Sequence, residues 1–305
     1  MLRYCATDMK NLNLGEKRSF LRLVLALVKP RIIELLLVTA VPVLVLASNG
    51  WPNWQVLTSV VLFGTLAAAG ANAWNSIIER EIDALMNRTK MRPLVTGEMK
   101  LNHSVFIALA LTVISITGMY VTANFAAAAL TAAAIGFYVL GYTILLKPRT
   151  NQNIVWGGIA GCFPVVIADA AVRGEVSLGG WILFLLVFFW TPAHYWPLAA
   201  HLKEDYSLAQ IPMLPVDKSE KTVAAWTLAY TILTITTSVA FYFVVEMGYV
   251  YLTATVIAGI VFLILSIKYY INIASDKPMS SMVIFHFSIS YLAIVFVAIA
   301  IDVLL

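Results

Sequence analysis

Charged residues and cysteines are both scarce in this 305-residue chain, and each shortage excludes a class of protein. Charged residues make up 12% of the sequence against 61% hydrophobic residues, and the mean hydropathy is +0.87. This balance excludes a soluble globular domain and leaves no room for a long polar linker. The two cysteines, Cys5 and Cys162, form no metal-binding or disulfide pattern. No basic stretch is interleaved with aromatic residues, so a nucleic-acid partner is not expected.

Long apolar runs take the place of polar sequence. Nine runs are long enough to cross a bilayer: 32–48, 56–78, 104–121, 124–146, 153–171, 178–200, 222–245, 248–267 and 281–303. Backbone groups in hydrocarbon must be hydrogen-bonded within the segment, and no alternating ten-residue pattern suggests strands, so the runs predict helices. The expected fold class is an all-α, multi-pass membrane protein with nine transmembrane helices.

The basic residues predict the orientation, because Lys and Arg accumulate on the cytoplasmic side. With the N-terminus inside, the inner segments are 1–31, 79–103, 147–152, 201–221 and 268–280, with 7, 5, 2, 3 and 2 Lys or Arg. They hold 19 of the 20 basic residues, and the outer loops hold only Arg173. We therefore expect a cytoplasmic basic N-terminal segment over 1–31, a nine-helix domain over 32–305, an inner (plasma) membrane location and a C-terminus outside.

The N-terminal segment contains a short apolar run of its own, from Phe20 to Val28. Basic residues flank it, which predicts an interfacial helix that turns into the membrane at Pro30. The run is not a signal peptide, because Lys29 interrupts it and no small-residue cleavage site follows.

Acidic residues gather in NSIIEREIDALMNRTKMRPL, from Asn75 to Leu94. Asn75, Glu79 and Asp83 are spaced four apart and line one face of a helix, whereas Glu81 points elsewhere. Two carboxylates and an amide offer the oxygen ligands that Mg²⁺ takes together with substrate phosphates. In a soluble protein such a segment would be a solvated helix end, but the surrounding sequence is apolar.

Basic residues of three inner loops fall on the same side of the membrane. Arg88 and Arg92 follow the acidic residues, Lys147 and Arg149 lie in the shorter loop, and Lys203 lies in the third. Guanidinium and ammonium groups suit phosphate oxygens. Ordinary cytoplasmic anchoring is the alternative for each of them taken singly.

A second polar segment runs from Trp190 to Pro215. His194, His201 and Asp205 fall on one helical stripe, which makes Asp205 a further candidate metal ligand. His194 lies within the sixth apolar run, where ionisable residues are usually functional. The alternative is a histidine that only hydrogen-bonds a neighbouring helix.

These motifs together resemble a known family. NSIIEREIDALMNRTKMRPL is similar to the first motif of the UbiA superfamily of intramembrane prenyltransferases, and Glu79 with the RTKMRPL tail resembles its protoheme IX farnesyltransferases. Further resemblances follow in order: KPRIIELLLVT at 29–39, LKPRTNQNIVWGGIAG at 146–161, WTPAHYW and EDYSLAQIPMLP within 190–215, and FHFSISYLAIVFVAIAID at 285–302. The chain departs from the pattern at Ala193 and Tyr195, where Pro and Phe are expected, and at 216–219. Neither departure removes an ionisable group.

The resemblance implies a nine-helix bundle around a central cavity. It also implies a reaction in which farnesyl diphosphate alkylates a vinyl group of heme b (protoheme IX), water adds, and heme o and diphosphate leave. The implied catalytic Mg²⁺ ligands are Asn75, Glu79, Asp83 and Asp205. The implied diphosphate-binding residues are Arg88, Arg92, Lys147, Arg149 and Lys203. His194 is the candidate for contacting the heme iron or a propionate.

Two other functions stay open at this stage. One is a UbiA-type prenyltransferase with another aromatic or tetrapyrrole acceptor. The other is a polytopic transporter, although transporters place charge at the bilayer midplane, whereas here it gathers at one face. The expected partners are farnesyl diphosphate, heme b and the lipid bilayer. The sequence leaves open whether a heme-modifying enzyme or a terminal oxidase is a partner.

Overall fold

The computed structural model describes residues 18–305, except the side chains of Arg31 and Ile32, and within this range it contains helices and no strands. The long helices are α3 (Pro30–Ser48), α4 (Trp54–Ile78), α6 (Leu101–Thr122), α7 (Phe125–Gly136) continued by the π-helix η1 (Phe137–Leu146), α9 (Ile159–Arg173), α10 (Leu178–His201), α13 (Glu220–Val245), α14 (Tyr249–Ala274) and α15 (Met282–Leu304). The short helices are α2 (Phe20–Val28), α5 (Arg80–Leu85), α8 (Asn153–Gly157), α11 (Lys203–Leu208) and α12 (Leu214–Asp217).

The helices confirm the expected multi-pass architecture. Within the described residues, eight helices are long and apolar enough to cross a membrane by themselves, with α7–η1 and α8–α9 each counted as one. A ninth span results when α2 and α3, which meet at a bend of 63°, are taken as one broken span. Each of the nine apolar runs thus coincides with a helix.

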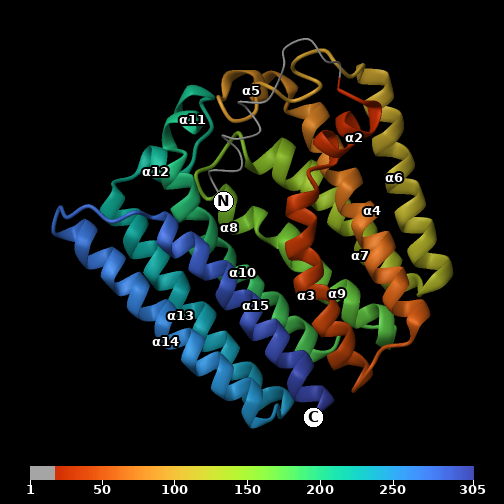
Figure 1. Cartoon of the computed structure of the whole chain (residues 1–305), viewed down its shortest axis with the longest axis vertical. Helices are drawn as coiled ribbons and strands as arrows, with labels where there is room; N and C mark the ends of the chain where they lie inside the picture. Colours follow the sequence, from red (N-terminus) through yellow and green to blue (C-terminus); the bar gives the residue numbers. More distant parts are fainter. Residues whose placement is uncertain (1–17) are drawn as a thin grey trace.

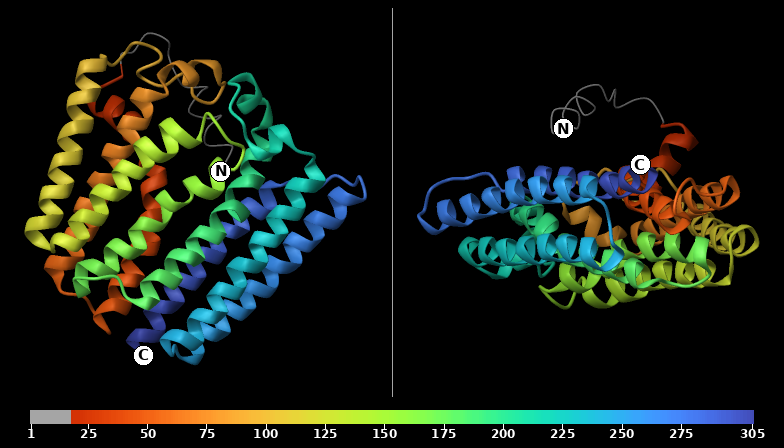
Figure 2. Two further views of the ribbon diagram at one scale, coloured as in Figure 1. Left: turned by 180° about the vertical axis from the view of Figure 1, so that it is seen from behind. Right: turned by 90° about the horizontal axis from the view of Figure 1, so that it is seen from below.

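The long helices form a closed ring in chain order. Each packs against the next, and α15 returns to pack against α3. Contacts of α3 with α9 and of α10 with α15 cross the ring, so the interior is divided rather than open. The helices run side by side along a common direction (Figures 1 and 2). This arrangement brings residues far apart in the sequence to the same level of the bundle.

The two ends of the bundle differ in character. The short helices α5, α11 and α12 gather at one end, α8 lies closer to the middle, and the C-terminus lies at the other end (Figure 1). The same separation is seen from behind (Figure 2, left). The end with the short helices carries the predicted inner loops 79–103 and 201–221, so these two loops meet in space.

Helix α2 covers part of this end, with the bounds that the sequence predicts. Ser19 caps its first turn by accepting from the Arg22 amide, and its C-cap Lys29 has φ 54°, a left-handed conformation that turns the chain into Pro30. Leu23 and Leu27 are buried in a cluster with Ala73 of α4. The opposite side of α2 is exposed, as an interfacial helix requires.

The predicted orientation can be tested by single-cysteine labelling in intact cells. Cys162 is fully buried, so a chain with Cys5 replaced by Ser is a suitable background. We expect cysteines at positions 90 and 218 to react only after the membrane is permeabilised, and cysteines at 51 and 173 to react from outside. Labelling of 90 or 218 by an impermeant reagent in intact cells would overturn the orientation.

Candidate active site

Helix α4 ends at the candidate site, and its register continues into α5. The Glu79 amide donates to the Asn75 carbonyl at 2.9 Å, and the Asp83 amide donates to the Glu79 carbonyl at 2.8 Å. Asn75, Glu79 and Asp83 are therefore on one face, and each is at most 3% exposed. The Glu81 side chain is 91% exposed. The expectation that these three residues share a face that Glu81 does not is confirmed.

Each residue of this face is bound to a cation from another part of the chain. Lys147 Nζ lies 2.5 Å from Glu79 Oε1, and Arg92 pairs with Asp83 Oδ2. Asn75 accepts from Lys29 Nζ at 2.6 Å. Burying these charges is tolerable only because they are paired in this way. We call Lys29, Asn75, Glu79, Asp83, Arg92 and Lys147 the polar cluster.

One fully buried oxygen of the polar cluster lacks a partner among the described residues. Asp83 Oδ1 is enclosed and makes no hydrogen bond with them, whereas its neighbour Oδ2 is bound to Arg92. A buried, unpartnered carboxylate oxygen carries a large desolvation cost unless a ligand completes it. Among the described residues, no three acidic, His or Cys side chains lie close enough together to hold a metal by themselves. The oxygen donors suit Mg²⁺, but further ligands have to come from a substrate.

Asp205 joins the two long inner loops. Its carboxylate accepts from the backbone amides of Asn87 and Arg88, both at 3.3 Å. The Arg88 guanidinium lies over the ring of Tyr206, 5.6 Å from its centroid. Asp205 thus holds the loop that carries Arg88 and Arg92, and it makes no hydrogen bond or ion pair with Glu79 or Asp83.

Two of the predicted diphosphate-binding residues lie apart from the polar cluster. Arg149 is exposed and donates to the carbonyls of Ile144 and Leu145 at the end of η1. Lys203 is also exposed, and within the described residues it forms no ion pair. Both lie at the same end of the bundle, but neither contacts an acidic residue of the cluster.

Sequence reasoning did not assign Lys29 to the site. The left-handed turn between α2 and α3 directs its amine toward Asn75. Lys29, Arg92 and Lys147 thus bring three basic side chains to one buried cluster, which would attract an anion. The available signal was the KPR sequence directly before the first span, which places a lysine at the membrane face.

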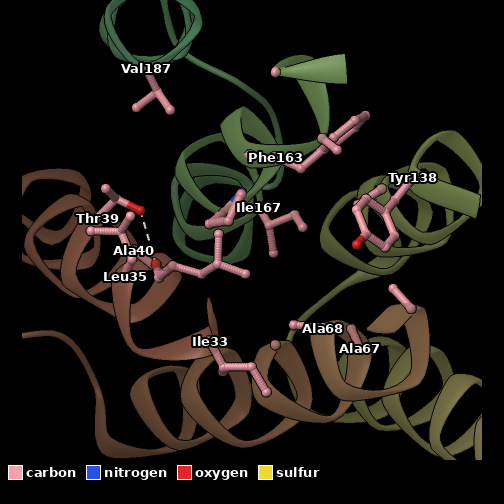
Figure 3. Close-up of a pocket in the computed structure, with 18 of the residues that line it drawn as sticks. Ile33, Leu35, Thr39, Ala40, Ala67, Ala68, Tyr138, Phe163, Ile167 and Val187 are labelled. Carbon is pink, nitrogen blue, oxygen red and sulfur yellow. Dashed lines mark hydrogen bonds between the residues drawn. The ribbon is translucent and has the colours of Figure 1, made fainter. Parts of the chain in front are cut away.

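An apolar cavity of about 340 Å³ lies among α3, α4, η1, α9 and α10. Its size is in the range of about 300–1,000 Å³ typical of small-molecule sites. The labelled side chains of these helices surround a common space, with Tyr138 facing Ala67 and Ala68 (Figure 3). Asn72 lines the cavity, and Asn75 lies one turn further along α4. The polar cluster therefore stands beyond the Asn72 end of the cavity, toward the predicted inner loops.

The π-helix η1 supplies the aromatic wall of the cavity. Tyr138 and Tyr142 stack on each other with centroids 5.8 Å apart, and Thr143 accepts from the Asn75 amide at 3.1 Å. A Cβ at Gly157 would stand 2.2 Å from the Tyr142 ring, so only glycine leaves room for this tyrosine. π-Helical turns often occur at functional sites. Here the turn directs tyrosines into the cavity and ends at Lys147, which pairs with Glu79.

His194 lies on α10 beside the cavity rather than in the polar cluster. Its ring stacks on Trp190, which lines the cavity. Its Nδ1 is 2.8 Å from the Ser288 hydroxyl of α15. The predicted stripe of His194, His201 and Asp205 is thus interrupted, because α10 ends at His201 and that side chain is exposed.

The fold and the site define a class: a multi-pass helical membrane protein in which a buried acid–base cluster closes one end of an apolar cavity. The model of the UbiA prenyltransferase family matches residues 36–289. The chain belongs to this family.

Curated relatives and solved structures agree with the family. The protoheme IX farnesyltransferase of Clavibacter michiganensis is 47% identical over 280 residues, which cover 92% of each chain. Protoheme IX farnesyltransferase 1 of Saccharopolyspora erythraea is 45% identical over 287 residues, covering 94% of this chain and 91% of the relative. A structure of digeranylgeranylglyceryl phosphate synthase has a TM-score of 0.76 at 18% identity, with 93% and 98% coverage. A UbiA homologue from Archaeoglobus fulgidus bound to GPP and Mg²⁺ has a TM-score of 0.67 at 16% identity, with 92% and 99% coverage.

Proposed function

We propose that this protein transfers the farnesyl group of farnesyl diphosphate to a vinyl group of heme b. Water adds in the same reaction, and the products are heme o and diphosphate. The observation that carries the proposal is the polar cluster beyond the Asn72 end of an apolar cavity, in a chain 47% identical to a protoheme IX farnesyltransferase. A lipid diphosphate matches this arrangement, because its charged head suits the polar cluster and its apolar tail suits the cavity.

The ion pairs of the polar cluster can be exchanged for contacts to substrate. Lys147, Arg92 and Lys29 bind Glu79 between α4 and α5, Asp83 on α5 and Asn75 on α4, respectively. When a diphosphate arrives, its oxygens attract these three cations, and the two carboxylates become available to a cation that the substrate brings. Arg88 lies at the same end, and Arg149 and Lys203 complete a basic rim. Holding the leaving diphosphate in this way stabilises the charge that develops when the allylic carbon–oxygen bond breaks.

A magnesium ion fits the donor set of this site. The residues that would hold it are Asp83, through its unpartnered Oδ1, together with Glu79 and Asn75, and Asp205 is the further candidate at the loop. When bound, the ion would act as a Lewis acid toward the diphosphate. The choice of Mg²⁺ rests on the ligand types, which are oxygen atoms only.

The cavity supports the second half of the reaction. Its apolar lining accommodates an isoprenoid chain and keeps water from the allylic carbon until the acceptor vinyl group attacks. Tyr138, Tyr142 and Tyr195 line it, and aromatic faces stabilise a nearby cation. His194 is the residue we assign to the heme, because it lies beside the cavity wall and outside the polar cluster.

The mass of hemes extracted from membranes tests this function. Membranes that express this chain in a host lacking heme o are expected to contain a farnesyl-hydroxyethyl heme that vector controls lack. The same extract with an Asp83→Ala variant is the control for dependence on the site. If the membranes contain a prenylated quinone precursor or another prenylated tetrapyrrole instead of this heme, the proposed acceptor is wrong, but the protein is still a prenyltransferase. If the protein transports a solute and no prenylated product forms, the proposal that it is an enzyme is wrong.

A further inference from the structure

The imidazole ring of His194 is held more firmly than packing alone requires. It is sandwiched between Trp190 and Phe285, with ring centroids 4.3 Å and 4.7 Å away and interplanar angles of 12° and 23°. Its Nδ1 lies 2.8 Å from Ser288 Oγ. Two stacking partners and one polar partner fix both the plane and the rotation of the ring.

The Ser288 hydroxyl is the basis for assigning the proton on the imidazole ring. Ser288 Oγ lies 2.7 Å from the Phe285 carbonyl, which can only accept. With its hydrogen on that carbonyl, the hydroxyl accepts from His194 and Nδ1 carries the N–H, and this is the tautomer we assign. No carboxylate pairs with His194 among the described residues, which favours the neutral imidazole. In that form Nε2 holds a free lone pair.

The Nε2 atom is available to a ligand. It has no hydrogen-bond partner among the side chains that the structure describes. His194 is half-buried, and Nε2 is not among the fully enclosed atoms. A fixed Nδ1–H donor opposite an open Nε2 is the arrangement that metal-ligating histidines use.

The position of His194 favours the acceptor rather than the diphosphate. Trp190, in contact with the imidazole, lines the cavity, and so does Leu292, one turn beyond Ser288 on α15. The other three histidines of the chain, His103, His201 and His286, are exposed, and none has a ring nitrogen bound to a described side chain. His194 is thus the histidine whose ring is prepared for a ligand beside the cavity.

We infer that His194 Nε2 is an axial ligand of the iron in the heme b acceptor, and that Ser288 is the positioning residue that fixes its tautomer. This inference rests on the proposed function. Ligation there would tether the macrocycle next to Trp190, which contacts the imidazole and lines the cavity.

The test compares heme b with metal-free protoporphyrin IX, which has the same ring and propionates without iron. Both are titrated into the purified full-length protein in lipid nanodiscs. For His194→Ala we expect affinity for heme b to fall by about 10- to 100-fold, while affinity for protoporphyrin IX is unchanged. The Soret band of the wild-type complex should show imidazole ligation, which the variant loses and added free imidazole restores.

Two further variants separate ligation from structure. Ser288→Ala keeps the imidazole but removes the hydroxyl that holds the N–H on Nδ1. We therefore expect about a tenfold loss of heme b affinity and a changed Fe–His stretching frequency in the ferrous complex. His201→Ala, at the exposed end of α10, should change neither.

Three results would overturn the inference. The first is an equal loss of affinity for heme b and for protoporphyrin IX in His194→Ala, which would indicate a propionate contact or a packing role. The second is unchanged heme b binding. The third is a spectrum of the wild-type complex that shows no imidazole ligation. This measurement does not depend on whether any variant folds. If any of them occurs while membranes still produce heme o, the ligand assignment fails and the proposed function stands. Absence of heme o from membranes that hold the folded protein rejects the proposed function itself.

Discussion

Replacing Asp83 by asparagine is expected to reduce turnover by a hundredfold or more, corresponding to the loss of a transition-state contact of about 3 kcal/mol. The substitution keeps the size and shape of the side chain and removes the charge. Asp83 is 1% exposed, and its Oδ1 has no hydrogen-bond partner among the residues that the structure describes, so this oxygen is the one we assign to the metal. The measurement is the rate of farnesyl transfer by purified protein supplied with farnesyl diphosphate and heme b.

The matched control for Asp83 is Glu81→Gln, two residues away on the other side of α5. The Glu81 side chain is 91% exposed, and its contact with Arg80, at 3.9 Å, is a surface pair of little energetic value. We expect Glu81→Gln to change turnover little and both variants to be recovered folded, as judged by size-exclusion profile and thermal unfolding. Equal losses at 81 and 83 would mean that this segment is a generic acidic surface.

Removal of divalent metal is expected to stop the reaction, with a loss of at least about a hundredfold because the metal opposes the charge of the leaving diphosphate. Glu79 and Asp83 already bind Lys147 and Arg92, and no three acidic, His or Cys side chains of the described chain come together. Mg²⁺ alone should therefore bind weakly, and the ion and the diphosphate should strengthen each other's binding. Turnover after thorough chelation and titration calorimetry of Mg²⁺ with and without farnesyl diphosphate measure the two effects.

Adding Mg²⁺ back to the chelated enzyme is the control, and it should restore the original rate. Unchanged turnover without divalent metal would remove the ion from the mechanism. Tight binding of Mg²⁺ in the absence of diphosphate would contradict the view that the cations must first move to the substrate.

Much of the fold and part of the site follow from the sequence. The nine apolar runs had to become helices, because hydrocarbon offers no other partner to their backbone groups. The spacing of Asn75, Glu79 and Asp83 placed them on one face, because helical geometry depends only on local separation. Their burial and the exposure of Glu81 agree with that argument. The motif resemblance also led to the family to which the chain belongs.

Which groups meet across the bundle was decided by the tertiary structure. The packing of η1 against α4 brings Lys147 to Glu79, and the turn at Lys29 brings its amine to Asn75. Arg149, which the sequence could not distinguish from Lys147, instead binds carbonyls at the end of η1.

The sequence by itself therefore determined the helices, their apolar character and the face that carries the acidic residues, because these depend on composition and local spacing. Only the tertiary structure decided the pairing of Lys147 with Glu79, the contact of Lys29 with Asn75 and the contact of His194 with Ser288. Each of these joins atoms from distant parts of the chain, and Ser288, for example, lies 94 residues beyond His194. No local pattern records such a contact, because it forms only when the ring of helices closes.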